Sequence, residues 1–123
     1  MSSFPVNHGA PAVGLVLEHV SGARVVYSGD ARADERIAAQ ITDSTLCLIH
    51  DCASGMHVTP RTAGHASAEE LHALLQRVPQ PEQLYITHLS ARQDGVLPDM
   101  LSLLQVDFRG TVCPAHDGLT LHF

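Results

Sequence analysis

Three residues of types that commonly bind divalent metals lie at or near the ends of predicted strands. His8 stands before an apolar stretch, Asp30 follows a predicted strand at 24–28, and His88 follows another at 84–87. Loops at strand ends of an α/β sheet converge to form sites, so we expect these side chains to meet. Two imidazoles and a carboxylate suit zinc or manganese, and a carboxylate can bridge two metals. Taken singly, each residue has a simpler interpretation: a loop histidine, a helix cap and a hydrogen-bonded turn residue.

Alternating strand and helix patterns supply the elements that must position these residues. They predict strands at 12–20, 24–28, 45–49 and 84–87, helices at 34–41, 67–78 and 98–104, and a closing hairpin of 111–114 with 119–123. Ser67 and Glu70 form a Ser-x-x-Glu capping box at the start of the second helix. Residues 51–66, rich in Gly, Pro, Ser and His, are expected to form a loop. This alternation indicates a layered α/β sheet domain.

The composition narrows the classes of function. The chain has 123 residues, 45% of them hydrophobic, and is expected to be a single domain. Its formal net charge is −6 and its seven basic residues are all arginine, so tight nucleic-acid binding by this chain alone is disfavoured. The three cysteines are not spaced as a zinc-binding pair of pairs and are expected to be free thiols. No apolar stretch or signal peptide points to a membrane, so we expect a cytoplasmic protein.

Six short segments occur in a fixed order along the chain. They are His8-Gly9 with Gly14, Ser28-Gly29-Asp30-Ala31-Arg32, Leu48-Ile49-His50-Asp51, His65-Ala66-Ser67, Thr87-His88-Leu89-Ser90-Ala91-Arg92, and Ala115-His116-Asp117-Gly118-Leu119. The ordered set resembles the C-terminal half of a metallo-β-lactamase-fold hydrolase, close to the ribonuclease Z branch. The resemblance covers nearly the whole chain. It implies an α/β (α+β) fold for residues 1–123, half of an αββα sandwich, with a mixed sheet and helices on one face.

The resemblance also implies roles for individual residues. His8 would bind one metal, His88 a second, and Asp30 would bridge both. The cofactor would be a divalent metal, zinc first and manganese or iron as alternatives. His65 would protonate the leaving oxygen in phosphodiester cleavage, which its position before a capped helix and its titration near neutral pH favour. A solvated loop histidine is the alternative for His65.

Three further residues are expected to support the site. His50 and Asp51 could orient the metal ligands through hydrogen bonds, or could simply be buried and hydrogen-bonded. Arg92 could contact a substrate phosphate, because a guanidinium binds phosphate in a bidentate way, or could tie down its own loop.

The chain departs from the family pattern in three ways. It lacks the His-x-His-x-Asp-His cluster that supplies ligands to both metals, so three side chains remain for two ions. Only Ser21-Gly22-Ala23 stands where many ribonuclease Z proteins carry a long arm that grips tRNA, which disfavours pre-tRNA processing. Ala31 replaces the usual Thr after Asp30, which removes one hydrogen-bonding group.

The missing cluster leads to an expectation about partners. The two halves of such a fold pack sheet against sheet, so a lone second half would expose an apolar face. We expect either a homodimer that mimics the sandwich or a complex with a separately encoded N-terminal half. The leading hypothesis is a metal-dependent hydrolase subunit or fragment, a phosphodiesterase of ribonuclease Z-like type, incomplete alone and acting on RNA or a small phosphodiester. The alternatives are a catalytically inactive dimeric binding module and a piece of a longer hydrolase.

Overall fold

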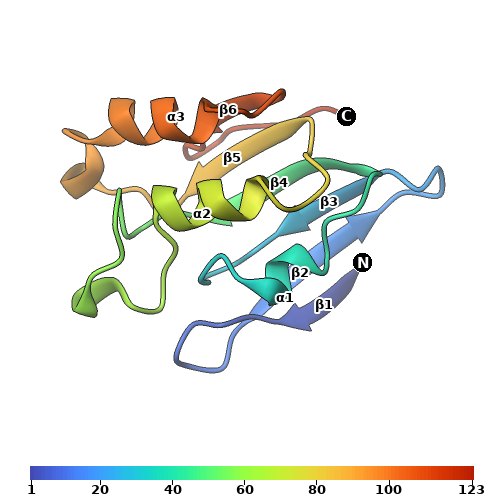
Figure 1. Ribbon diagram of the computed structural model, residues 1–123. Coiled ribbons are helices and arrows are strands. Elements are labelled where there is room, and N and C mark those ends of the chain that lie inside the picture. The colour runs from blue at the N-terminus through green and yellow to red at the C-terminus, as the bar shows by residue number, and fades with distance from the viewer.

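A six-stranded mixed sheet is the framework of the computed structural model, which describes residues 1–123 (Figure 1). The strands are β1 (Ser2–Pro5), β2 (Val13–Glu18), β3 (Arg24–Tyr27), β4 (Thr45–Asp51), β5 (Gln83–Thr87) and β6 (Thr111–Pro114). They lie in chain order across the sheet; β1, β2 and β3 pair antiparallel, whereas β3 to β6 pair parallel. The C-terminal ends of β3, β4 and β5 therefore meet at one edge of the sheet, where crossover loops can form a site.

Three helices connect the parallel strands and lie over one face of the sheet (Figure 1). They are α1 (Glu35–Ala38), α2 (Ala68–Leu75) and α3 (Leu97–Gln105). Two 3-10 helices, η1 (Pro60–Thr62) and η2 (Ala91–Gln93), lie in the loops that follow β4 and β5. No helix has the length and apolar composition needed to cross a membrane.

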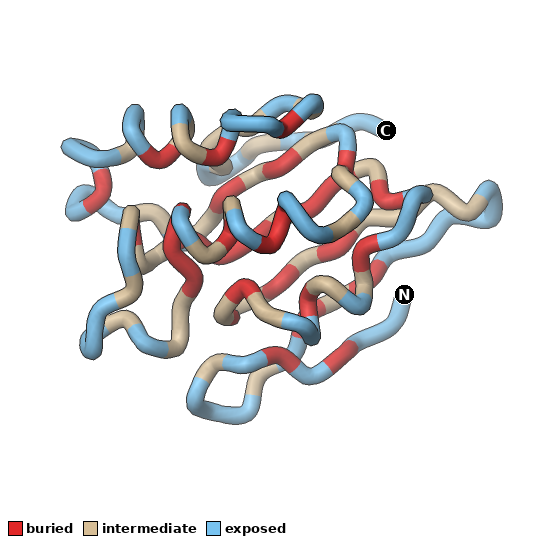
Figure 2. Tube along the Cα trace, viewed as in Figure 1, coloured by how far each residue is buried: buried red, intermediate tan, exposed pale blue.

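The hydrophobic core lies between the helices and the sheet. A single cluster of 20 buried residues includes Val26, Leu48 and Ile86 from the strands and Leu71 and Leu104 from the helices. Figure 2 shows these buried positions along the strands and on the sides of the helices that face them. Because side chains alternate along a strand, one face of each strand contributes to this core and the other face points away from the helices.

The opposite face of the sheet carries apolar side chains that no helix covers. One row crosses five strands in register: Leu15 pairs with Tyr27, Tyr27 with Ile49, Ile49 with Tyr85, and Tyr85 with Cys113. The five side chains are partly exposed, and we call them the uncovered row. Val13 and Leu17, which flank Leu15 on β2, are 56% and 46% exposed.

The sequence predicted most of this architecture. The mixed sheet with helices on one face is confirmed, as are the four predicted strands and three predicted helices, with bounds that shift by a few residues. The predicted capping box is only half formed. Ser67 accepts a hydrogen bond from the backbone N–H of Glu70, but the Glu70 carboxylate binds the guanidinium of Arg32 and does not reach back to the Ser67 backbone.

Two predictions about strands are wrong. Strand β1 was not expected, although it pairs with β2 along its whole length. The predicted closing hairpin does not form. A turn is present, because Leu119 N–H donates to the carbonyl of His116, but residues 119–123 do not pair with β6. β6 satisfies its backbone groups against β5 on its other side, in parallel.

Candidate metal centre

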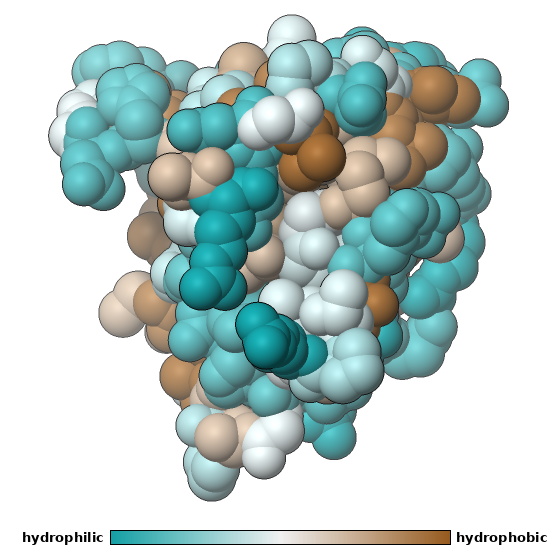
Figure 3. All heavy atoms as spheres, turned by 90° about the vertical axis from the view of Figure 1, so that its left-hand side faces the viewer, coloured by the Kyte–Doolittle hydropathy of each residue, from teal (hydrophilic) through white to brown (hydrophobic).

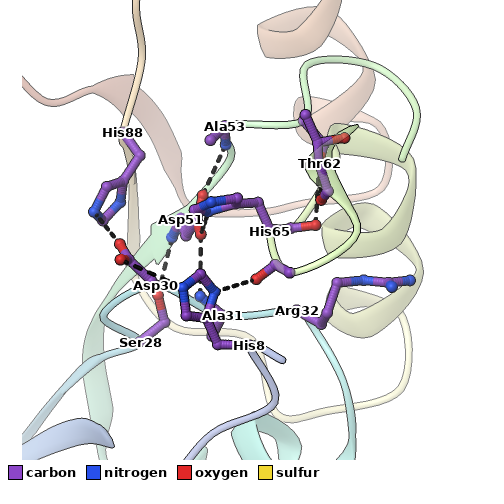
Figure 4. A network of polar contacts seen from close by, with 12 residues as sticks. His8, Ser28, Asp30, Ala31, Arg32, Asp51, Ala53, Thr62, His65 and His88 are labelled. Carbon is purple, nitrogen blue, oxygen red and sulfur yellow. Dashed lines mark hydrogen bonds and ion pairs between the residues drawn. The ribbon is translucent and has the colours of Figure 1, made fainter. Parts of the chain in front are cut away.

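Five side chains converge where the parallel strands end (Figure 4). Asp30 follows β3, Asp51 is the last residue of β4, and His88 comes directly after β5. His8 comes from the loop between β1 and β2, and His65 from the loop between β4 and α2. The surface around this end of the sheet is mostly hydrophilic (Figure 3). The three residues expected to be metal ligands thus share one site.

The carboxylate of Asp30 lies between two imidazoles. Its Oδ1 is 2.6 Å from His88 Nε2, and its Oδ2 is 3.8 Å from His8 Nε2. The Asp30 side chain is 44% exposed, so one side of the group is open to solvent and to a ligand. Each carboxylate oxygen therefore has its own imidazole nitrogen nearby, an arrangement suited to a bridging ligand.

Both imidazoles are held through the nitrogen that points away from Asp30. His8 Nδ1 donates to the backbone carbonyl of Gly64 at 2.8 Å, and His88 Nδ1 hydrogen-bonds with Thr87 Oγ1 at 3.0 Å. Metal-binding histidines typically have such a partner on the second ring nitrogen, because it fixes the ring and the tautomer. The Nε2 atoms of both rings are thus presented to the site, and this donor set fits a divalent metal.

Backbone geometry orients the side chains of His88 and His8. His88 has a φ of 60°, in the left-handed region that non-glycine residues rarely adopt. This conformation breaks the alternation of β5 and costs on the order of 1–3 kcal/mol, which points to a functional constraint. Gly64 packs so closely on His8 that a Cβ atom would lie 2.1 Å from the His8 carbonyl oxygen. The absence of a side chain there lets the loop approach His8, so that the Gly64 carbonyl accepts a hydrogen bond from His8 Nδ1–H.

Asp51 is fully buried and accepts three hydrogen bonds. Its Oδ2 accepts from the backbone N–H of Ala31 at 3.0 Å and from His65 Nδ1 at 2.5 Å, and its Oδ1 accepts from the backbone N–H of Ala53 at 2.8 Å. The backbone N–H of Asp51 itself donates to Ser28 Oγ at 2.9 Å. Asp51 and His65 thus form a carboxylate–imidazole pair in which the carboxylate is buried and the imidazole is partly exposed, and we call this pair the dyad. Of the two alternatives that the sequence left open for Asp51, the structure shows the buried, hydrogen-bonded residue, and its side chain contacts His65.

The dyad touches the histidine–Asp30 cluster. The ring of His65 lies 5.0 Å from that of His8 and 6.3 Å from that of His88, between centroids. Ligand atoms of Asp30, Asp51 and His65 all lie within 4.8 Å of one another, which makes this triad a second candidate for holding a metal. Each oxygen of the buried Asp51 carboxylate already accepts a hydrogen bond. We therefore favour His8, Asp30 and His88 as metal ligands and treat the dyad as a separate group.

The two remaining predicted residues lie apart from the cluster. His50 is fully buried; its Nδ1 donates to the Asp51 carbonyl at 2.7 Å, and its Nε2 has no partner. Burial lowers the pKa of His50, and the hydrogen bond to Asp51 opposes this effect only in part, so the ring stays neutral. Arg92 is exposed, and its guanidinium makes no hydrogen bond or ion pair within the chain. It lines a cavity together with His65 and His88.

Arg32 is a structural residue of the site that the sequence reasoning missed. Its Nε bonds both carboxylate oxygens of Glu70 at 3.0 Å, and its Nη1 donates to the carbonyl of Ala63. These bonds fasten the loop that carries His65 and Gly64 to α2 and to the turn after Asp30. The hydrogen bonds to Glu70 come first among the causes that raise the pKa of Arg32. Arg32 belongs to the Ser28–Arg32 segment of the family resemblance, but sequence spacing alone could not identify Glu70 as its partner.

The fold matches a solved structure. The metallo-beta-lactamase fold protein YhfI from Bacillus subtilis is similar to this chain with a TM-score of 0.77 and 19% sequence identity, over 96% of this chain and 46% of YhfI. The chain therefore has a metallo-β-lactamase fold, and it spans about half the length of that protein. No family model matches the chain, and no curated protein matches it in sequence. The ribonuclease Z-like branch and the assignment to a C-terminal half stay predictions.

Proposed function

We propose that this chain is the metal-binding part of a hydrolase that cleaves phosphodiesters and that it is incomplete on its own. The observation that carries the proposal is the position of Asp30 between His8 and His88, beside the Asp51–His65 dyad. The metallo-β-lactamase fold of the chain supports the same class of chemistry. Membership of the ribonuclease Z-like branch is the specific form of this proposal, on the six ordered segments of the sequence, with RNA or a small phosphodiester as the substrate.

His8, Asp30 and His88 would hold the metal, with zinc as the first choice and manganese or iron as alternatives. A divalent metal bound there supplies a Lewis acid that activates water and stabilises negative charge on phosphoryl oxygens. Asp30 would bridge two ions, because each of its oxygens faces a different imidazole. Three side chains do not close two metal sites, so further ligands would come from another polypeptide or another part of a longer chain.

His65 would deliver the proton to the leaving oxygen. Its Nδ1 is held by Asp51, so its Nε2 is the nitrogen left to exchange a proton with a substrate. Asp51 is fully buried and fixed by two backbone N–H groups, so it holds the imidazole in one orientation. In this assignment Asp51 is a positioning residue, and His65 is the group that contacts the substrate.

The uncovered row is the proposed contact with the missing part. Two sheets that pack face to face bury apolar rows of this kind at a spacing of about 10 Å. The partner would be a second copy of the chain or a separately encoded N-terminal half, and sedimentation velocity separates the two. Replacement of Tyr85 by Lys is expected to abolish self-association of a homodimer. A parent chain that is monomeric excludes the homodimer and leaves a separately encoded half, or another part of a longer chain, as the missing part.

Metal affinity tests the ligand assignment. Zinc binding to the chain is measured by competition with a chromophoric chelator, for the parent chain and for H8A, D30N, H88A and H65A. We expect the first three replacements to weaken zinc binding at least tenfold and H65A to change it less than threefold. H19A is the control, since His19 bonds only within its own turn. A loss in H65A that equals the loss in H8A would assign the metal to the Asp30–Asp51–His65 triad and would remove His65 as proton donor.

A non-catalytic binding module is the second candidate, favoured by the small number of ligands and by the uncovered row. It predicts tight self-association. It also predicts that the zinc-loaded chain does not hydrolyse bis(p-nitrophenyl) phosphate, either by itself or together with a separately encoded N-terminal half. Hydrolysis that is lost in H65A at unchanged zinc content would exclude it.

A further inference from the structure

A cavity of about 580 Å³ opens beside the dyad. Its walls come from residues 53–62 of the loop after β4 and from residues 88–96 after β5, and they include His65 and His88. This volume lies in the range of small-molecule sites. Most of its lining residues are polar or charged, and none of them is Phe, Tyr or Trp.

Two guanidinium groups in this cavity have no partner in the chain. Side-chain hydrogen bonds engage four of the seven arginines: Arg24, Arg32, Arg36 and Arg77. The other three, Arg61, Arg92 and Arg109, make none, and Arg61 and Arg92 both line the cavity. In a chain with a formal charge of −6, two unpaired arginines in one cavity are a local concentration of positive charge.

Both arginines lie in short 3-10 helices that side-chain hydrogen bonds stabilise. Arg61 is the middle residue of η1, where the side chains of Thr59 and Thr62 form a reciprocal capping box. Arg92 is the middle residue of η2, which has a capping box between Ser90 and Gln93. The Gln93 side chain also donates to the carbonyl of Ala53 at 2.6 Å and so ties η2 to the loop after β4. The positions from which the two guanidinium groups extend are therefore fixed before a ligand binds.

We propose that this cavity binds a second phosphate of the substrate, on the leaving-group side of the bond that is cleaved. The inference rests on the proposed function, because His65 is the group that gives a proton to the leaving oxygen and His65 lines the cavity. The leaving group must then extend past His65 towards Arg61 and Arg92. Guanidinium groups bind phosphate oxygens in pairs of parallel hydrogen bonds, which suits this arrangement.

The substrate class that fits is a small phosphodiester with a phosphorylated leaving group, not a long RNA. A polynucleotide would meet a chain of net charge −6 whose remaining arginines are mostly paired. The contact of one further phosphate with two arginines needs no extended basic surface.

The test measures binding of pyrophosphate to the metal-free chain by isothermal titration calorimetry, for the parent chain and for R61A, R92A and R109A. R109A is the matched control, because it removes the same charge from the third unpaired arginine, which lies outside this cavity. Loss of one charge-assisted hydrogen-bonding group predicts that R61A and R92A each weaken binding about tenfold or more. R109A should change it less than twofold. Circular dichroism of each variant confirms that the fold is retained.

Equal effects in all three variants, or no pyrophosphate binding by the folded parent chain, would overturn the proposal. A ten-nucleotide RNA that binds far more tightly than pyrophosphate and is weakened equally by all three replacements would also overturn it, in favour of an extended nucleic-acid surface. Because this assay contains no metal and no hydrolysis, its outcome is separate from that of the proposed function. Selective loss in R61A and R92A supports the subsite even where the zinc-loaded chain hydrolyses nothing.

Discussion

Replacement of Asp51 by Asn tests the dyad most directly, because it changes hydrogen-bonding capacity with almost no change in shape. The Asp51 carboxylate accepts from the backbone N–H groups of Ala31 and Ala53 and from His65. An Asn side chain has one acceptor oxygen and one NH₂ group, so in either orientation the NH₂ faces one of the backbone N–H donors. One of these donors then loses its acceptor inside the protein.

The cost follows from that lost bond. A buried donor without a partner costs about 1–3 kcal/mol, and the remaining hydrogen bonds lose their charge assistance, so we take a total of about 2 kcal/mol. For a chain of 123 residues the unfolding entropy near the midpoint is about 0.26 kcal/mol per kelvin, which converts this loss into a fall in Tm of about 8 °C.

Thermal unfolding of the metal-free protein, followed by circular dichroism, measures the effect. Asp30→Asn is the matched control, since Asp30 is 44% exposed and accepts no backbone hydrogen bond. We expect its Tm to change by less than about 2 °C. The pattern for zinc affinity is reversed: the Asp30 replacement weakens binding and the Asp51 replacement does not. Equal Tm values for the two variants would refute the view that Asp51 is the buried anchor of the site.

Two further predictions concern a glycine and two thiols. Gly64→Ala places a Cβ 2.1 Å from the His8 carbonyl oxygen, so it should lower both the Tm and the zinc affinity. Gly95→Ala is the control, because its Cβ would meet no atom within 4 Å, and it should change neither quantity. Equal behaviour of the two variants would contradict the role of the close approach between Gly64 and His8. Burial raises the pKa of Cys47 and of Cys52 from 9.0 to about 12, so the folded state keeps protons that the unfolded state releases above pH 9. The free energy of unfolding should therefore be unaffected by these thiols below pH 9 and fall above it, by about 1.4 kcal/mol per pH unit for each thiol up to about pH 12. Guanidinium unfolding at pH 8, 9 and 10 measures this slope, and a constant free energy of unfolding would contradict it.

The elements of the parallel half were predictable from the sequence because each has a strong local signal. The strand that ends at Asp51 is apolar, and α2 begins with a cap at Ser67 that is present in the structure. β1 has no comparable signal, because it is only four residues long and ends in Pro5. Its pairing depends on Gly14, where an added Cβ would lie 2.4 Å from Phe4 Cζ. That fit between two strands is a tertiary contact, which local patterns do not reveal.

The site divides in the same way. Asp30 and His88 were predictable as a pair, because polar residues that follow parallel strands come to one edge of a sheet. The contact of Asp51 with His65 was not, since the intervening loop has no repeating pattern and its path depends on bonds such as those of Ser54 Oγ with the carbonyls of Thr62 and His65. The left-handed backbone at His88 likewise has no signal in residue type, because nothing about a histidine requires a positive φ.

The strand order has a consequence for how the chain folds. Each strand of the sheet pairs only with the strands next to it in sequence, from β1 to β6. No strand inserts between two strands that are consecutive in the chain. Each pairing therefore closes only the segment between two consecutive strands, which keeps the loop-closure entropy lower than in a sheet whose strands pair out of chain order. During synthesis the sheet can grow by one strand at a time, and the residues of the site come together only when β5 has joined β4 and delivers His88 to Asp30.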